Sequence, residues 1–225
     1  MSTVNELRTA ALYPDLSHTL AAPLLQGTEY PWQALTGLKE FIRALGPTLP
    51  AEEYELIGEE IWASRSARIA PTACINGPAI IGPDTEVRHC AFIRGSALVG
   101  AGAVVGNSTE LKNVILFDGV QVPHYNYVGD SILGFKSHMG AGAITSNVKS
   151  DKTLTVIRVG DEKLETGLKK LGAILADHVE VGCNSVLNPG TVIGANSSIY
   201  PLTRVRGYVP ANHIVKGEAG MVAKF

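Results

Sequence analysis

The chain has 225 residues, of which 45% are hydrophobic, and this is enough to form a sizeable core in one domain with an appendage. Because the formal net charge is only −2, we expect neither nucleic acid nor an anionic membrane surface as the main partner. No window approaches the ~20 apolar residues of a membrane span. The N-terminal stretch also lacks the basic start and apolar run of a secretion signal.

The cysteines Cys74, Cys90 and Cys183 are odd in number, widely spaced and free of any CxxC pair. A disulfide framework is therefore not expected, and a reducing cytoplasm is the predicted location. We expect these cysteines to be small buried residues.

The first 60 residues lack any repeat and contain one helical pattern. Between Pro31 and Gly46 the apolar residues recur at steps of three and four, which is typical of an amphipathic helix. Proline suits the first turn of such a helix, and glycine suits its C-terminal cap. The segment from Glu52 to Ile61 is expected to form a second, shorter helix. Residues 1–60 are therefore interpreted as a helical cap region or as a contact in an oligomer.

A six-residue repeat fills residues 61–145. Eight successive steps of six place an aliphatic residue each time: Ile69, Ile75, Ile81, Val87, Ile93, Val99, Val105 and Leu111. The residue four positions after each is small in seven of the eight cases. Since a period of six fits neither a helix at 3.6 nor continuous strand alternation at 2, it predicts short strands joined by sharp bends. The frame slips by one residue twice, before Leu116 and before Leu133.

Residues 146–172 interrupt the repeat. The stretch 153–159 alternates like a strand, and Gly160-Asp161-Glu162 is a turn signal, so a projecting hairpin is predicted. The six-residue steps resume from Leu175 to Val205. The predicted coil domain therefore spans 61–208, and residues 209–225 form a short tail.

The succession of an aliphatic residue, often a glycine, two free positions and a small residue resembles the hexapeptide-repeat transferases. The resemblance implies a mainly β fold, a left-handed parallel β-helix in which three hexads make one triangular coil. The handedness comes from the resemblance alone, because parallel crossovers are otherwise right-handed. The resemblance also implies a homotrimer with its sites in clefts between neighbouring subunits.

The stretches 106–113, 122–130 and 140–147 are similar to the acetyltransferase half of the bifunctional bacterial enzyme of UDP-N-acetylglucosamine synthesis. That half transfers acetyl from acetyl-CoA to the amine of glucosamine 1-phosphate. Residues 167–173 look more like archaeal sugar-1-phosphate nucleotidyltransferases with a fused acetyltransferase. No glycine-rich nucleotide loop precedes the repeats. A separate nucleotidyltransferase that docks on residues 1–60 is therefore a candidate partner.

The chemistry of such a transfer requires a base and cations. An amino sugar is mostly ammonium at neutral pH, and a histidine can take its proton as the nitrogen attacks a thioester. The resemblance gives this role to His124, with Glu110 as the carboxylate that orients the imidazole. Arg94 and Lys112 match the family's phosphate-binding pair. Each follows an inward aliphatic residue, so both could project outward from equivalent positions.

Three further residues are expected to contact the sugar. Tyr127 and Asn147 match a tyrosine and an asparagine of the family, and His138 stands where a second asparagine is usual. His138 can still donate a hydrogen bond to a hydroxyl, but the change puts the identity of the sugar in question.

The resemblance also supplies contacts for acetyl-CoA. Ala141 matches a small residue whose backbone meets the thioester, and Cys183 replaces a serine near the acetyl group. Pro201 replaces an alanine near the cofactor. Lys170, with its neighbour Lys169, stands where a phosphate or CoA could reach. No metal is required for this chemistry.

The predicted function is acetyl-CoA-dependent N-acetylation of a hexosamine 1-phosphate, glucosamine 1-phosphate first. The alternatives are transfer to another phosphorylated or nucleotide-linked amino sugar, and a non-catalytic assembly or regulatory role on the same fold. A γ-class carbonic anhydrase, which needs two histidines five residues apart on one chain, is disfavoured because no pair of the six histidines has that spacing.

Overall fold

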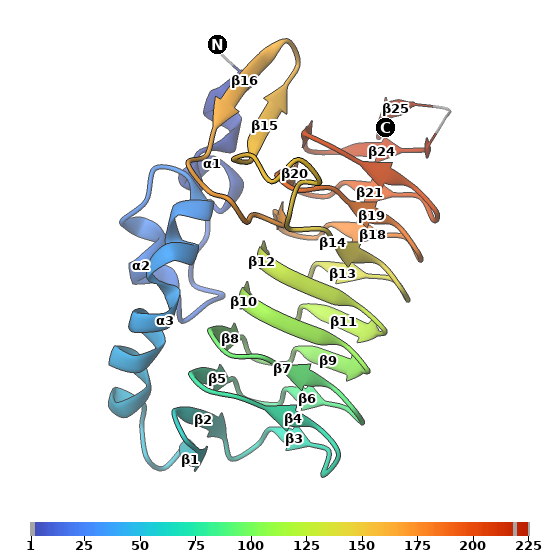
Figure 1. The fold of residues 1–225 in the computed structure, drawn as a ribbon. Coiled ribbons are helices and arrows are strands. Elements are labelled where there is room, and N and C mark those ends of the chain that lie inside the picture. The colour runs from blue at the N-terminus through green and yellow to red at the C-terminus, as the bar shows by residue number, and fades with distance from the viewer. Residues whose placement is uncertain (1–2, 218–219, 225) are drawn as a thin grey trace.

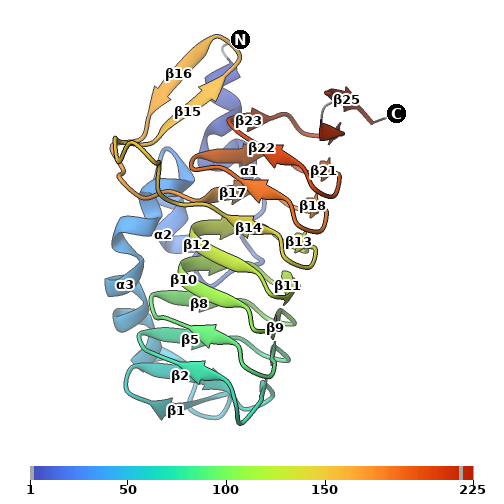
Figure 2. The same ribbon diagram turned by 45° about the vertical axis from the view of Figure 1, so that its right-hand side comes forward.

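The hexads fold into short strands that stack coil upon coil in parallel register, as Figures 1 and 2 show. The structure is a computed structural model that describes residues 3–217 and 220–224. Each coil contributes a strand to each of three faces, with a bend at each of three edges. The fold is therefore the predicted mainly β, left-handed parallel β-helix.

Every strand of the prism belongs to one of three faces, and two long strands run from one face onto the next. Face I comprises β4 (Cys74–Ile75), β7 (Phe92–Ile93), the first halves of β10 (Glu110–Leu116) and β12 (Tyr127–Leu133), β14 (Ile144–Thr145), β19 (Val186–Leu187) and β22 (Arg204–Val205). Face II comprises β2 (Ile61–Ser64), β5 (Ala79–Ile81), β8 (Ala97–Val99), the second halves of β10 and β12, β17 (Ala173–Leu175), β20 (Thr191–Ile193) and β23 (Tyr208–Val209). Face III comprises β3 (Arg68–Ile69), β6 (Glu86–Val87), β9 (Val104–Asn107), β11 (Gln121–His124), β13 (His138–Met139), β18 (Glu180–Val181), β21 (Ser198–Ile199) and β24 (His213–Val215). We name the edge between faces III and I edge 1, the edge between II and III edge 2, and the edge between I and II edge 3.

The core is the axis of the prism. The aliphatic residues of the repeat from Ile81 to Leu111 point inward and are buried, whereas Ile69 and Ile75 in the first coil are only partly covered. Most small positions are buried as well, and the threonine hydroxyls among them donate to carbonyls, whereas the buried hydroxyl of Ser137 has no partner within the described residues. Thr85 donates to the carbonyl of Gly100 at 2.7 Å, and Thr109 donates to that of Val122 at 2.9 Å. Burial of these hydroxyls therefore costs little.

The two slips of the repeat have one structural cause. Strands β10 and β12 run straight through edge 3, so each of these coils needs one residue fewer at that corner. Asn113 and Asp130 take left-handed backbone angles there, with φ of 55° and 47°. Side chains from two successive coils are therefore stacked at a tightened edge.

The N-terminal region lies along face II. It comprises 3₁₀ helices η1 (Thr3–Leu7), η2 (Pro31–Gln33) and η3 (Gly46–Thr48) and α-helices α1 (Thr9–Leu12), α2 (Ala22–Gln26) and α3 (Ala34–Leu45). Helix α3 buries Leu35, Leu38 and Ile42 and contacts β8 and β10, which confirms the helix predicted for residues 31–46. In both views the helices flank the stack of coils and do not close its end (Figures 1 and 2). None of the helices in the described ranges is long and apolar enough to cross a membrane.

The second predicted helix, residues 52–61, is wrong. This segment forms β1 (Tyr54–Gly58), which turns back at Glu60 and pairs antiparallel with β2. Strand β2 in turn pairs with β5 of the first coil. An open strand edge favours pairing, and here it outweighs local helix propensity.

Other segments can be compared with their predictions directly. The hairpin is confirmed: β15 (Val156–Val159) and β16 (Glu162–Glu165) pair antiparallel and project at the top of Figure 1. In the tail, β24 still pairs with β21 in parallel, and β25 (Met221–Ala223) then pairs antiparallel with β24. The coils thus continue past residue 208. The three cysteines are exposed and unpaired, so the expectation that they are buried is wrong.

Candidate functional site

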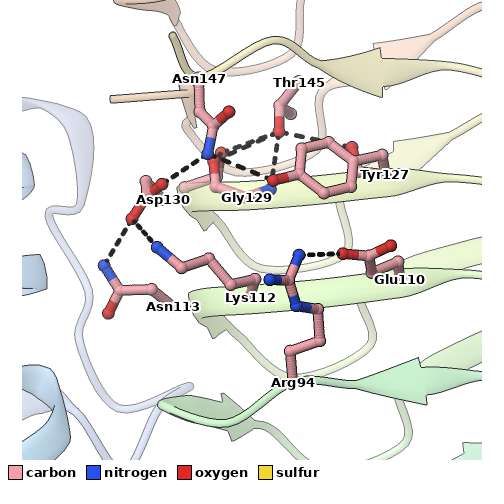
Figure 3. Close-up of polar contacts among 10 residues, drawn as sticks. Arg94, Glu110, Lys112, Asn113, Tyr127, Gly129, Asp130, Thr145 and Asn147 are labelled. Carbon is pink, nitrogen blue, oxygen red and sulfur yellow. Dashed lines mark hydrogen bonds and ion pairs between the residues drawn. The ribbon is translucent and has the colours of Figure 1, made fainter. Parts of the chain in front are cut away.

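Face I carries a polar network built on three successive coils, those of β10, β12 and β14 (Figure 3). Its centre is the carboxylate of Asp130, whose side chain is only 5% exposed. It accepts hydrogen bonds from the ammonium of Lys112 at 3.0 Å, the amide of Asn113 at 2.9 Å and the amide of Asn147 at 2.6 Å. The same amide of Asn147 reaches the hydroxyl of Tyr127 at 3.2 Å. Residues separated by up to 35 positions are thereby fixed around one buried charge.

The second part of the network is an ion pair one coil lower. Ile93 and Leu111 are register partners in β7 and β10, so Arg94 and Lys112 follow equivalent inward residues on face I, as the hexads predict. The guanidinium of Arg94 donates to Glu110 at 2.7 Å. This hydrogen bond raises the pKa of Arg94. Arg94, Glu110 and Lys112 therefore present two cations and a carboxylate on one open face.

Tyr127 links the two parts of the network. Burial raises the pKa of Tyr127, the amide of Asn147 opposes this, and the charges of Asp130 and Glu110 raise the pKa further. The phenol therefore stays protonated at neutral pH and can donate a hydrogen bond to a ligand.

Edge 1 carries a second row of predicted residues. At this edge, the N–H of a residue donates to the carbonyl of the residue one coil below. The links run from Tyr125 to Asn107 at 2.9 Å, from Gly142 to His124 at 3.0 Å, from Asn184 to Ala141 at 2.9 Å and from Leu202 to Cys183 at 2.9 Å. The donors Tyr125, Gly142, Asn184 and Leu202 all have φ between 50° and 71°. His124, Ala141, Cys183 and Pro201 therefore stand one above another, ~5 Å apart per coil.

His124 and Glu110 lie on the two sides of edge 1, in neighbouring coils. His124 ends β11 on face III, and Glu110 begins β10 on face I. Glu110 is bonded to Arg94, and within the described residues the His124 imidazole has no hydrogen-bond partner. The predicted carboxylate–imidazole contact is thus not formed inside this one chain.

Two predicted residues lie apart from both groups. His138 begins β13 near edge 2 on face III, where its ring pairs with Glu180 at 2.8 Å. It is in register with Gln121, so it stands three residues, or ~10 Å, along the face from the His124 row. Lys170 follows the hairpin, and its backbone pairs with that of Val148.

Sequence reasoning missed Asp130, which is the hub of the network. A signal was present, because Asp130 lies in the coil where the repeat slips for the second time. A slipped corner marks a change in edge geometry, and a polar residue there was worth naming. In the part of the chain that the structure covers, no group of three or more His, Cys, Asp or Glu side chains could hold a metal ion.

Part of the chain is similar to known proteins. A model described as the GMPPB C-terminal domain matches residues 75–159. A bifunctional sugar-1-phosphate nucleotidylyltransferase/acetyltransferase of Sulfurisphaera tokodaii is 36% identical over 90 residues, covering 40% of this chain and 22% of that protein. The bifunctional protein GlmU of Methanococcus maripaludis is 36% identical over 88 residues, covering 39% and 21%. This chain resembles those bifunctional proteins. It spans about a fifth of their length.

Two of the solved structures that are similar to this chain are WeeI and the acetyltransferase domain of PglB. WeeI of Acinetobacter baumannii AYE is 15% identical with a TM-score of 0.41, over 68% of this chain and 57% of that one. The acetyltransferase domain of PglB from Neisseria gonorrhoeae, in complex with acetyl coenzyme A, is 13% identical with a TM-score of 0.35, over 73% and 57%.

Proposed function

We propose that the chain is a CoA-dependent acyltransferase that acetylates the amine of a hexosamine 1-phosphate, with glucosamine 1-phosphate as the first candidate. The observation that supports this most is the arrangement around edge 1. Cations and hydrogen-bond donors suited to a sugar phosphate lie on face I, and an exposed imidazole ends the adjoining strand of face III. The resemblance to bifunctional nucleotidylyltransferase/acetyltransferases supports the same chemistry.

In the proposed reaction, the amine nitrogen attacks the thioester carbonyl of acetyl-CoA. The new C–N bond forms, the C–S bond breaks, and the thiolate of CoA leaves. His124 accepts the proton that the amine loses. Arg94 and Lys112 hold the phosphate of the sugar, and the phenol of Tyr127 and the amide of Asn147 orient its hydroxyls.

The donor is proposed to run along edge 1. Its thioester lies beside His124, against the backbone of Ala141, and its arm continues past Cys183. The side chains of Ala141, Cys183 and Pro201 in this row are short, which leaves room for such an arm. We further propose a homotrimer, because His124 is exposed and its ring lacks a partner within the described chain, so a neighbouring subunit could close the cleft and supply what orients the ring. Sedimentation equilibrium would test this assembly.

The test is release of free thiol from acetyl-CoA with a panel of amino-sugar 1-phosphates. His124→Ala should lower kcat by about 10²–10⁴-fold, the usual loss when a general base is removed. His89 is a matched control, because it holds the equivalent position on edge 1 two coils lower, bonded to Thr72. His89→Ala should keep full turnover. Equal turnover of His124→Ala and wild type would contradict the role of His124 as the base. If wild type released no thiol with any acceptor, a non-catalytic role would be favoured.

A further inference from the structure

Above the network, face I holds a cavity of about 610 Å³, and none of the proposed acceptor-binding residues lines it. Its lining includes Ser146 and Asn188 together with the charged residues Lys149, Asp151, Arg204 and Arg206. Ser146 directly precedes Asn147, a member of the network on Asp130. The cavity therefore begins beside the proposed acceptor site, on the same face.

The two arginines are the chemically informative residues of this cavity. Arg204 and Arg206 flank the buried Val205, so both side chains point outward from face I, ~7 Å apart at their backbones. Both are exposed, and neither guanidinium has an ion pair or side-chain hydrogen bond within the described residues. In contrast, Arg43, Arg65, Arg88 and Arg94 all pair with carboxylates. Two adjacent unpaired guanidiniums suit phosphate oxygens, which they can bind in a bidentate manner.

The remaining charges of the cavity leave it positive. Lys149 contributes an ammonium that is held by Asp151 at 3.4 Å and by the hydroxyl of Thr153. Asp151 is the one carboxylate among the cavity's lining residues, against three cations. The carboxylate of Asp151 accepts hydrogen bonds from the backbone N–H and the hydroxyl of Thr153 at 3.0 and 2.8 Å. The cavity thus attracts an anion of more than one charge.

The spacing indicates what kind of ligand reaches this cavity. From Lys112 to Arg206 there are four coil steps along face I, or ~19 Å, which is beyond the span of one sugar phosphate bound at Lys112. Along edge 1, three coil steps separate His124 from Pro201, or ~14 Å, and Arg204 follows Pro201 by three residues. A pantetheine arm, roughly as long as four or five extended residues, would span ~15 Å. A ligand that reaches from His124 to this cavity would therefore be long and carry phosphate at its far end.

We propose that Arg204, Arg206 and Lys149 form a second phosphate-binding site, which takes the phosphates of a nucleotide. The identity of the natural ligand rests on the proposed function. Two ligands of that function carry phosphate groups that could bind here. One is the nucleotide end of CoA, with its thioester beside His124. The other is the diphosphate of a nucleotide-linked amino sugar. The cavity binds either through the same guanidiniums, and the experiment separates them.

The test compares wild type with Arg204→Ala/Arg206→Ala by calorimetry, with pyrophosphate, CoA, dephospho-CoA, pantetheine and UDP as probes. Pyrophosphate binding should weaken about 10–100-fold, as expected when charge-assisted hydrogen bonds are lost. An equal loss for CoA but not for UDP assigns the site to the donor, and the reverse assigns it to a nucleotide-linked acceptor. Binding of pantetheine, which lacks phosphate, should not change.

Two controls keep the outcome decisive. Arg68→Ala removes an exposed arginine from a two-residue strand on face III and should leave all binding unchanged. Arg204→Lys/Arg206→Lys should recover part of the pyrophosphate affinity. If the double alanine variant binds every phosphate probe as wild type does, or if wild type binds none of them, the site does not exist. If the binding losses appear while wild type releases no thiol, the phosphate site stands and the proposed acyl transfer fails.

Discussion

At the scale of single residues, Asp130 holds the ammonium of Lys112 in place on face I. Its nearly buried carboxylate accepts three hydrogen bonds, from Lys112, Asn113 and Asn147. Asp130→Asn replaces an oxygen by an NH₂ group that must face these donors, and we expect it to cost about 1–3 kcal/mol of stability. Because Lys112 loses its anchor, KM for the sugar phosphate should rise more than kcat falls. Denaturant unfolding and steady-state kinetics measure the two effects.

A matched control separates the effect of Asp130 on the position of Lys112 from its effect on the stability of the fold. Asn113→Gly removes one donor to Asp130, and glycine tolerates the left-handed angle of this position. It should lower stability and leave KM near that of wild type, since the bond from Lys112 to Asp130 remains. An unchanged KM in Asp130→Asn would show that the carboxylate serves the fold alone.

For these residues, the repeat predicts which side chains point inward and which point outward, and no more. Arg94 and Lys112 could be placed on one face because each follows an inward aliphatic residue. The second slip of the repeat marked the coil that contains Asp130, but it did not show the role of this residue, which depends on how β12 crosses edge 3. Nor could the spacing show that Glu110 bonds to Arg94 and that His138 lies ~10 Å along face III, paired with Glu180. Those outcomes depend on rotamers and on which neighbour is nearer.

At the scale of elements, the base of the hairpin packs closely against the coils at Gly190. Gly190, with φ of 77°, approaches Thr155 so closely that an added Cβ would lie 2.7 Å from the methyl group of Thr155. The following strand β15 buries Ile157 beside the same glycine. The contact at Gly190 therefore helps to hold the loop before the hairpin, which includes Lys149, over face I, in addition to the backbone hydrogen bonds from Ser146 to Leu187 and from Leu171 to Asn147. The periodicity predicted a hairpin here but not its attachment, since glycine at position 190 also suits an ordinary bend.

Gly190→Ala should therefore displace the hairpin and the loop before it. We expect a loss of about 2–3 kcal/mol, from the left-handed angle and the close contact together. Pyrophosphate affinity should fall as well, because Lys149 moves. Gly160→Ala is the control, since Gly160 has φ of 58° at the hairpin tip and no atom within 4 Å of its added Cβ. It should cost about 1 kcal/mol and leave pyrophosphate binding intact. Equal effects of the two changes on binding would contradict the attachment.

At the scale of the whole molecule, the N-terminal region is joined to the prism along edge 2. The ring of His18 stacks on that of Phe135 with 3.7 Å between centroids, and the ring of His178 meets that of Phe135 edge-on with 5.5 Å between centroids. The N–H of Asp118 donates to the carbonyl of His18 at 3.0 Å. Tyr13, fully buried nearby, donates to the carbonyl of Leu175 at 2.9 Å. Two half-buried carboxyls, Asp118 and Asp177, lie within this junction, so its strength depends on pH.

Both carboxyls disfavour their charged form in the folded chain. Burial raises the pKa of Asp118 and of Asp177, although backbone N–H groups of Ala101 and Phe135 donate to them and oppose the rise. The charges of His18 and His178 also oppose it, and that of Asp15 adds to the rise in Asp177. A raised pKa on folding means that the contribution to stability is fully present below the unfolded pKa, near about 4, and is lost as pH rises through the folded value.

Asp118→Asn/Asp177→Asn keeps the carbonyl-type acceptors without the charge. The variant should therefore exceed wild type in unfolding free energy at about pH 8 by up to roughly 1 kcal/mol, with the difference closing near about pH 4. Urea unfolding at both pH values measures this. A variant less stable than wild type at the higher pH would mean that attraction to the histidines outweighs burial at this junction.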